Sequence, residues 1–215
     1  MTATTRAARR DPASNRLMEI LAVVLLGVAT VGTAWCGYQA ARWNGEQGDL
    51  ARDSSDLRVE AARLFGLATQ AVAFDANLVA QYAQAVVDGD TDLQTFYRET
   101  LFREDFLPIL DAWEEQVEAG GGPPPRLFED EAYLEQQLAP YQDAVTQAER
   151  TAGESDEAGE NADEYVLTTL LLATALFFAG VTTSFRVRAA RLVLLAGSAF
   201  TIAYSASRLA ELPVV

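Results

Sequence analysis

Three apolar stretches constrain the fold of this chain more than any other feature. They cover residues 20–36, 165–185 and 192–207. An α-helix rises ~1.5 Å per residue, so ~20 apolar residues are needed to cross a hydrocarbon core of ~30 Å. The stretches approach that length when their apolar or aromatic neighbours are included. The sequence therefore predicts an all-α protein with three transmembrane helices, at residues 17–37, 165–185 and 192–209.

Two of these spans leave an alternative open. The third is rich in small and hydroxylated residues and closes with Arg208, so a helix lying in the membrane interface is the alternative there. The first follows basic residues and contains small residues at Gly32 and Ala34, as a cleaved signal peptide does. Cleavage would leave two spans in the mature protein. The length of the apolar run and the helical pattern beyond Ala34 favour a retained span.

The arginines beside the spans predict the orientation of the chain. Four arginines precede the first span and three occupy the loop between the second and third: Arg6, Arg9, Arg10, Arg16, Arg186, Arg188 and Arg191. Short cytoplasmic segments of membrane proteins carry an excess of positive residues. We therefore expect a multi-pass protein of the cell membrane. Its cytoplasmic parts are a tail at residues 1–16 and a basic loop at residues 186–191, and residues 38–164 and 210–215 are extracytoplasmic.

The segment between the first two spans is strongly acidic. Residues 37–164 contain 28 Asp and Glu against 8 Arg, and the whole chain has a formal net charge of −15. A surface of this sign repels polyanions, so we expect no nucleic-acid partner. The same charge keeps an exposed helical domain soluble, and it can attract cations or basic proteins.

The residue inventory removes most catalytic chemistry. The chain contains no histidine and one cysteine, Cys36. It therefore cannot form a Ser–His or Cys–His nucleophile pair, an imidazole metal site or an internal disulfide. No glycine pattern of a phosphate-binding or dinucleotide-binding loop is found. We expect no enzyme, no catalytic residue and no cofactor.

The acidic segment has the pattern of long helices. A seven-residue repeat begins at Leu50 and continues to about Val87, with Ser54 and Asp75 as polar breaks in it. A second repeat begins at Leu134 and leads into the second span. We expect a long antiparallel helix pair that is continuous with the first two spans and forms an extracytoplasmic helical bundle, with short helices at its tip.

Small residues occur near the membrane in both long helices. They are Gly45, Gly48, Ala51 and Ser54 in the outgoing helix, and Ala152, Ser155, Ala158, Gly159 and Ala162 in the returning one. Small side chains let helix backbones approach closely, so we expect these two stretches to touch. The alternative is that Gly45, Gly48 and Gly159 mark flexible or broken turns.

The tip of the bundle is predicted from residues 91–118. One straight helix running towards the membrane would end too low for the returning helix to begin. Two arrangements remain: a helix that crosses the tip, or two short helices that meet near Pro108 with Asp105 as a cap. The glycines and prolines at residues 120–125 then form an exposed linker.

An aromatic and polar group stands at the outer edge of the first span. It consists of Trp35, Tyr38, Gln39 and Trp43. Tryptophan and tyrosine favour the headgroup region of a bilayer, so the group is interpreted as a membrane-interface anchor. The alternative is a contact surface for neighbouring helices or a lipid.

A second group has the spacing of a calcium-binding loop. Asp88, Asp90, Asp92 and Glu99 occupy positions one, three, five and twelve of that pattern, which makes them candidate calcium ligands. Position six, however, is Leu93, where the sharp turn of the loop needs glycine. The simpler interpretation is that Gly89 ends one helix and Thr91 or Asp92 caps the next.

Two stretches of the sequence resemble a group of known proteins. The stretch WCGYQAARW at residues 35–43 follows an N-terminal span, and RVRAAR at residues 186–191 separates paired C-terminal spans. With the acidic helical middle, these stretches resemble bacterial three-span integral membrane proteins of unknown function. The resemblance implies membrane localisation and a helical architecture, and it implies no activity, cofactor or site.

Two functions are compatible with this pattern. The first is a structural or interaction subunit, in which the extracytoplasmic helices self-associate or dock a partner membrane protein, so that the lipid bilayer and a homo-oligomer or partner subunit are the expected contacts. The second is a receptor-like sensor that binds a small solute or cation at the helical tip. The small cytoplasmic portion leaves no room for an output domain, so the first function is favoured.

Overall fold

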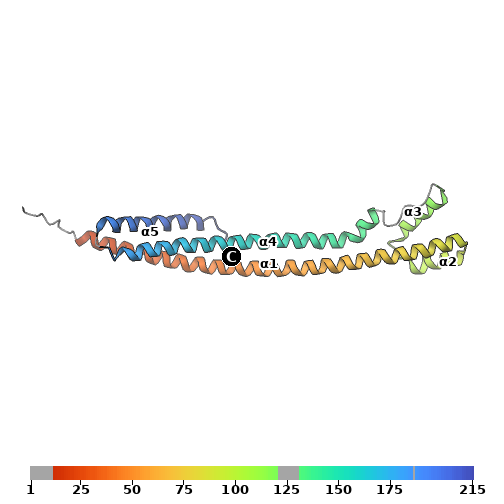
Figure 1. Ribbon diagram of the computed structural model, residues 1–215, viewed down its shortest axis with the longest axis horizontal. Helices are drawn as coiled ribbons and strands as arrows, with labels where there is room; N and C mark the ends of the chain where they lie inside the picture. Colours follow the sequence, from red (N-terminus) through yellow and green to blue (C-terminus); the bar gives the residue numbers. More distant parts are fainter. Residues whose placement is uncertain (1–11, 121–130, 186) are drawn as a thin grey trace, which may run out of the picture. The chain divides into compact units, whose positions relative to one another are not determined.

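The computed structural model describes residues 12–120, 131–185 and 187–215. These residues form helices and connecting turns, with no strand among them. The elements in order are α1 (Pro12–Asp88), α2 (Thr91–Phe96), a π-helical turn η1 (Tyr97–Leu101), α3 (Leu107–Glu118), α4 (Glu131–Thr182) and α5 (Arg188–Leu209). The predicted all-α class is confirmed for the described residues, and the labels α1 to α5 appear in Figure 1.

The chain divides into two compact units, and α1 and α4 contribute to both. Unit 1 comprises Met1–Ala51 and Gly153–Val215, and unit 2 comprises Arg52–Ala152. Unit 1 therefore contains α5 and the adjoining parts of α1 and α4. Unit 2 contains α2, η1, α3 and the remaining parts of the two long helices.

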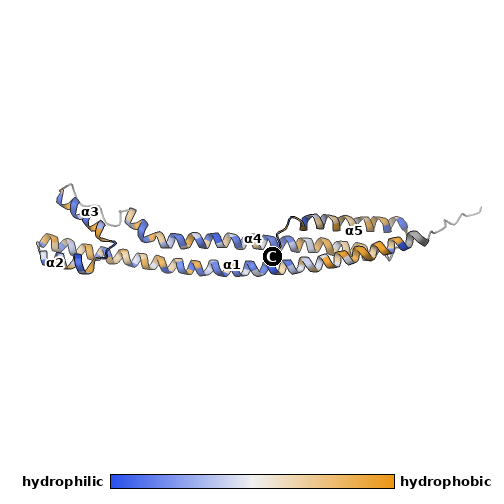
Figure 2. Cartoon of the chain, turned by 180° about the vertical axis from the view of Figure 1, so that it is seen from behind, coloured by the Kyte–Doolittle hydropathy of each residue, from blue (hydrophilic) through white to orange (hydrophobic). Residues whose placement is uncertain are grey.

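Unit 1 holds the apolar sequence stretches. Helices α1, α4 and α5 are each long and apolar enough to cross a membrane. Their large apolar side chains point outwards: Val23 is 70% exposed, Val31 71% and Phe200 73%. Figure 2 shows the hydrophobic colour along α5 and along the parts of α1 and α4 beside it. An apolar exterior over a core of small residues is typical of helices solvated by lipid.

Small residues let the helices of unit 1 pack closely. Ala29, Cys36 and Ala175 are fully buried in this core, and Ser198 Oγ donates a hydrogen bond of 3.0 Å to the Ala175 carbonyl oxygen. A Cβ atom added at Gly32 would lie 2.9 Å from a methyl group of Leu172. A larger residue at Gly32 would therefore displace the Leu172 side chain where α1 meets α4.

The predicted contact between the small-residue stretches is found near Gln47. Ser155 Oγ donates to the Gln47 carbonyl oxygen at 3.0 Å, and a Cβ atom at Gly159 would lie 2.5 Å from Gln47 Nε2. By contrast, Gly45 and Gly48 have no atom within 4 Å of an added Cβ. All these residues lie inside helices, so the alternative of broken turns at the glycines is wrong.

Unit 2 has a different core, which is built from large side chains. Its buried apolar residues are Leu78, Tyr82, Phe102, Phe106, Leu110 and Tyr133. Phe106 stacks on Phe102 and meets the Tyr133 ring edge-on, with ring centroids 5.4 and 5.7 Å apart. Near the boundaries of unit 2 in the sequence, Ser54 Oγ donates to the Ala148 carbonyl oxygen at 2.9 Å. Aromatic burial therefore fixes the short helices, while a small-residue contact joins α1 to α4.

The short helices differ in detail from the prediction. As predicted, α1 ends at a glycine, because Gly89 takes a left-handed conformation with φ +71°. The cap of α2 is Asp90, whose carboxylate accepts from the Leu93 N–H at 3.0 Å, and so Thr91 and Asp92 were the wrong choices. The cap starts α2 one residue earlier than the sequence pattern suggested.

The segment after α2 is also more irregular than predicted. It continues as η1, turns at the extended residue Phe102, and resumes as α3 with Pro108 in its first turn. Asp105 does not cap α3, since its carboxylate pairs with Arg103 at 3.2 Å instead. The linker predicted at residues 120–125 lies outside the described residues, apart from Gly120, which has φ +68°.

Candidate functional site

The predicted membrane-interface group divides into outward-facing and inward-facing residues. Trp35 and Tyr38 are exposed, and their ring centroids lie 6.0 Å apart. Trp43 Nε1 instead donates to the Pro213 carbonyl oxygen at 3.2 Å, and the Tyr165 hydroxyl donates to the same oxygen at 3.0 Å. Trp43 therefore holds the segment after α5 against α1, whereas Trp35 and Tyr38 face outwards.

Gln39, the fourth residue of that group, is buried. Its side chain has no exposed surface, and neither of its amide atoms has a hydrogen-bond partner among the described residues. Ser205 Oγ on α5 is likewise buried without a partner there. These groups have the capacity to bind a small polar molecule such as water, because a buried amide without hydrogen bonds is unfavourable.

Two of the four candidate calcium ligands make local hydrogen bonds in unit 2. Asp88 accepts from Gln84 Nε2 at 3.0 and 3.1 Å, and Asp90 caps α2. Asp92 lies in the first turn of α2, and Glu99 lies in η1. Within residues 12–120, 131–185 and 187–215, no group of three or more His, Cys, Asp or Glu side chains is placed to hold a metal ion.

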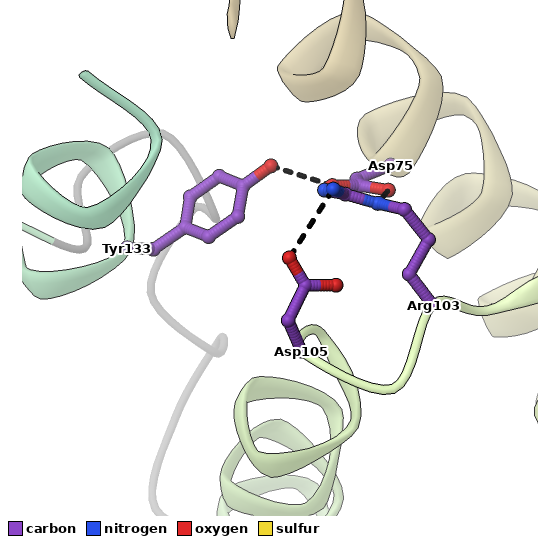
Figure 3. Close-up of polar contacts among 4 residues, drawn as sticks. All are labelled: Asp75, Arg103, Asp105 and Tyr133. Carbon is purple, nitrogen blue, oxygen red and sulfur yellow. Dashed lines mark hydrogen bonds and ion pairs between the residues drawn. The ribbon is translucent and has the colours of Figure 1, made fainter. Parts of the chain in front are cut away.

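The most deeply buried ionic group of unit 2 is centred on Asp75 (Figure 3). The Asp75 carboxylate is fully buried, and its Oδ2 accepts from the Tyr133 hydroxyl at 2.7 Å and from Arg103 Nη2 at 2.5 Å. Arg103 Nη1 also donates to Asp105 at 3.2 Å. Asp75 lies on α1, Tyr133 on α4, and Arg103 between η1 and α3. One carboxylate therefore links three segments of the chain.

The charges of this centre are mutually stabilising. The hydrogen bond to Asp75 raises the pKa of the Arg103 guanidinium, so it stays charged. Burial, and then the hydrogen bond to Asp75, raise the pKa of Tyr133 well above its usual range, so the phenol stays a donor. This arrangement holds the three segments together, because removal of Arg103 would leave a buried carboxylate without its counter-charge and removal of Tyr133 would take away a hydrogen bond from it.

Sequence reasoning identified Asp75 only as a polar break in the heptad repeat. Its partners lie 28 and 58 residues further along the chain. Arg103 and Tyr133 have no periodic relation to Asp75, so no local pattern predicts their pairing. The one available signal was the charge itself, since a buried carboxylate in a helix contact requires a donor from elsewhere.

Unit 2 also contains a pocket of about 190 Å³. Its lining residues are Tyr82, Val86, Gln94, Trp113, Glu114, Val117 and Glu118. The Tyr82 hydroxyl donates to Glu114, which also accepts from Arg98 Nη1 at 2.9 Å. Burial, and then the bond to Glu114, raise the pKa of Tyr82 to about 12. Two aromatic rings beside carboxylates form a surface that attracts small cations.

Comparison with known proteins adds no assignment. No family model matches the chain, and no match was found among curated proteins or solved structures.

The Asp75 centre predicts a large difference between two aspartate variants of the full-length protein in detergent. Asp75→Ala removes the acceptor of the Tyr133 hydroxyl and the partner of Arg103, whose side chain is 37% exposed and can be hydrated, so we expect the free energy of unfolding to fall by about 2–3 kcal/mol. Asp105→Ala removes an exposed partner of Arg103, so its effect is within about 1 kcal/mol. Denaturant unfolding followed by circular dichroism measures both. Equal losses for the two variants would contradict the assigned role of Asp75.

Proposed function

We propose that the chain is a three-pass membrane protein that holds unit 2 outside the cytoplasm. Helices α1, α4 and α5 supply the apolar lengths required to cross a bilayer. Arginines lie before the first span and beside the start of α5, which places both on the cytoplasmic side. Unit 2 and the C-terminus then lie on the opposite side.

We further propose that unit 2 acts as an interaction module. The observation that carries this proposal is its exposed apolar surface outside the predicted spans. Phe74 is 50% exposed, Phe96 51% and Val87 81%. Residues 52–152 contain 20 Asp and Glu, so charge would suffice for solubility, and the exposed large apolar side chains indicate a surface that a partner covers. The absence of histidine from the whole sequence favours this function over catalysis.

Site-specific photocrosslinking in native membranes tests the interaction function. A photoreactive phenylalanine analogue at Phe74 or Phe96 should give covalent adducts that mass spectrometry identifies. The same analogue at Gln142, an exposed polar position of α4, is the control and should give few adducts. Absence of adducts from both apolar positions would contradict the proposal.

A second candidate function is recognition of a small organic cation, and the pocket at Trp113 favours it. The pocket volume of about 190 Å³ excludes large ligands, and its aromatic and acidic lining suits an alkylammonium group. Binding there would contact α1 and α3 together, since Tyr82 and Glu114 come from these helices. Unit 2 would then be a solute-sensing domain that signals through a partner.

Thermal stability of the full-length protein with tetramethylammonium and ethylammonium tests this candidate. We expect the wild type to melt at a higher temperature with either cation, and Trp113→Leu to lose that increase while Trp35→Leu, far from the pocket in sequence and in unit 1, retains it. An increase that survives in Trp113→Leu would show that the pocket is not the binding site.

A further inference from the structure

Between residues 64 and 87, α1 has no charged residue on its exposed surface. Residues 64–87 include a single charged residue, Asp75, and its carboxylate is fully buried. At ~1.5 Å per residue, this leaves ~36 Å of helix whose exposed side has no ionised group. In a segment of net negative charge, so long an uncharged surface requires an explanation other than solubility.

The other helices of unit 2 do not share this property. Exposed residues of α4 in this unit include Glu131, Glu135, Asp143 and Glu149, and those of α3 include Asp111 and Glu115. The contrast excludes a general scarcity of charge in the unit. The uncharged surface belongs to α1 alone among the described helices of unit 2 that are long enough to compare.

Seven exposed residues of this surface lie on one side of the helix, and their residue types recur every seven positions. We call them the neutral face: Gly66, Gln70, Ala73, Asn77, Ala80, Gln84 and Val87, all of them exposed. Small or apolar residues recur at 66, 73, 80 and 87, and amides recur at 70, 77 and 84. Leu67 and Phe74, each about half exposed at 49% and 50%, flank the neutral face on one side. This alternation of fours and threes is the spacing of a helix that packs against another helix.

We propose that the neutral face binds the same face of a second copy of this chain, in a parallel pair; the inference deepens the proposed interaction function and rests on it. Two copies repel each other through their acidic surfaces, and the neutral face is where they can approach without like-charge contacts. Small residues at every seventh position allow that approach. The exposed parts of the Leu67 and Phe74 side chains supply apolar area that the pair would bury.

The amides favour a partner that is identical and parallel. Copies in one membrane share one orientation, so a twofold axis along the membrane normal brings equivalent residues together. An amide has both donor and acceptor groups and can therefore pair with its own copy, which a carboxylate or a guanidinium cannot. In the single chain Asn77 donates to the Ala73 carbonyl oxygen and Gln84 to Asp88, so rotation of these side chains would exchange local bonds for bonds across the pair.

Cysteine crosslinking of the full-length protein in its native membrane tests the proposal. Ala73→Cys and Ala80→Cys should each give a disulfide-linked dimer on mild oxidation, and two different tags should co-purify in it. Thr146→Cys, exposed on α4, should give at least tenfold less dimer, and the wild type none, because Cys36 is buried. A disulfide-linked dimer that forms only when Ala73→Cys chains are mixed with Ala80→Cys chains, and not in a sample of either variant by itself, would overturn the parallel arrangement.

A charge variant distinguishes specific pairing through the neutral face from chance collisions of chains in the membrane. Ala73→Glu places two carboxylates opposite each other, so it should lower the dimer yield of Ala80→Cys at least tenfold, while Thr146→Glu leaves it unchanged. No dimer from either neutral-face cysteine would overturn the inference. If photocrosslinking at Phe96 then still captured another protein, the interaction function would stand with a different partner; if it captured none, both would fail.

Discussion

Close approach of α1 and α4 is the constraint on which the rest of the structure depends. In unit 1 side chains of the facing helix lie directly over Gly32 and Gly159, and in unit 2 small residues such as Ala61, Ala68 and Ala148 are buried between the helices. Serine hydroxyls bond to carbonyl oxygens of the facing helix in each unit, at Ser54 and Ser155. Short side chains bring the backbones near enough for these bonds, which large apolar side chains would prevent.

The same close contact determines which surfaces remain for other tasks. Small residues occupy much of the inside of unit 1, together with Tyr165 and Leu172, and many of its other large apolar side chains lie outside on helices that are long and apolar enough to cross a membrane. In unit 2 the large side chains are instead gathered beneath α2, η1 and α3, around Phe106 and Tyr133. That packing covers one side of α1 and leaves the neutral face open. The proposed lipid contact and the proposed protein contact therefore use different surfaces of the same helix.

The sequence predicted what periodicity and length control, and it failed where distant residues decide the outcome. Three apolar helices, the end of α1 at Gly89 and the contact near Gln47 follow from local composition. The cap at Asp90 was missed because Asp90, Thr91 and Asp92 are all residue types that cap helices. Which of them caps α2 depends on the backbone conformation, which the sequence pattern does not give. Likewise, Asp105 was predicted to cap α3 because it precedes Pro108 at a suitable spacing. Its ion pair with Arg103 forms only because the chain turns after η1, and that turn was not predicted. The buried positions of Asp75 and Gln39 agree with helix periodicity, but their surroundings come from other helices and could not be predicted.

The central claim is that unit 2 lies outside the cytoplasm while the turn before α5 lies within it. Labelling intact cells with a membrane-impermeant maleimide tests it most directly, with Gln142→Cys reporting on unit 2 and Val187→Cys on the turn; both positions are exposed, whereas Cys36 is buried. We predict that Gln142→Cys reacts in intact cells and that Val187→Cys reacts only after the membrane is permeabilised. The reverse pattern would contradict the account.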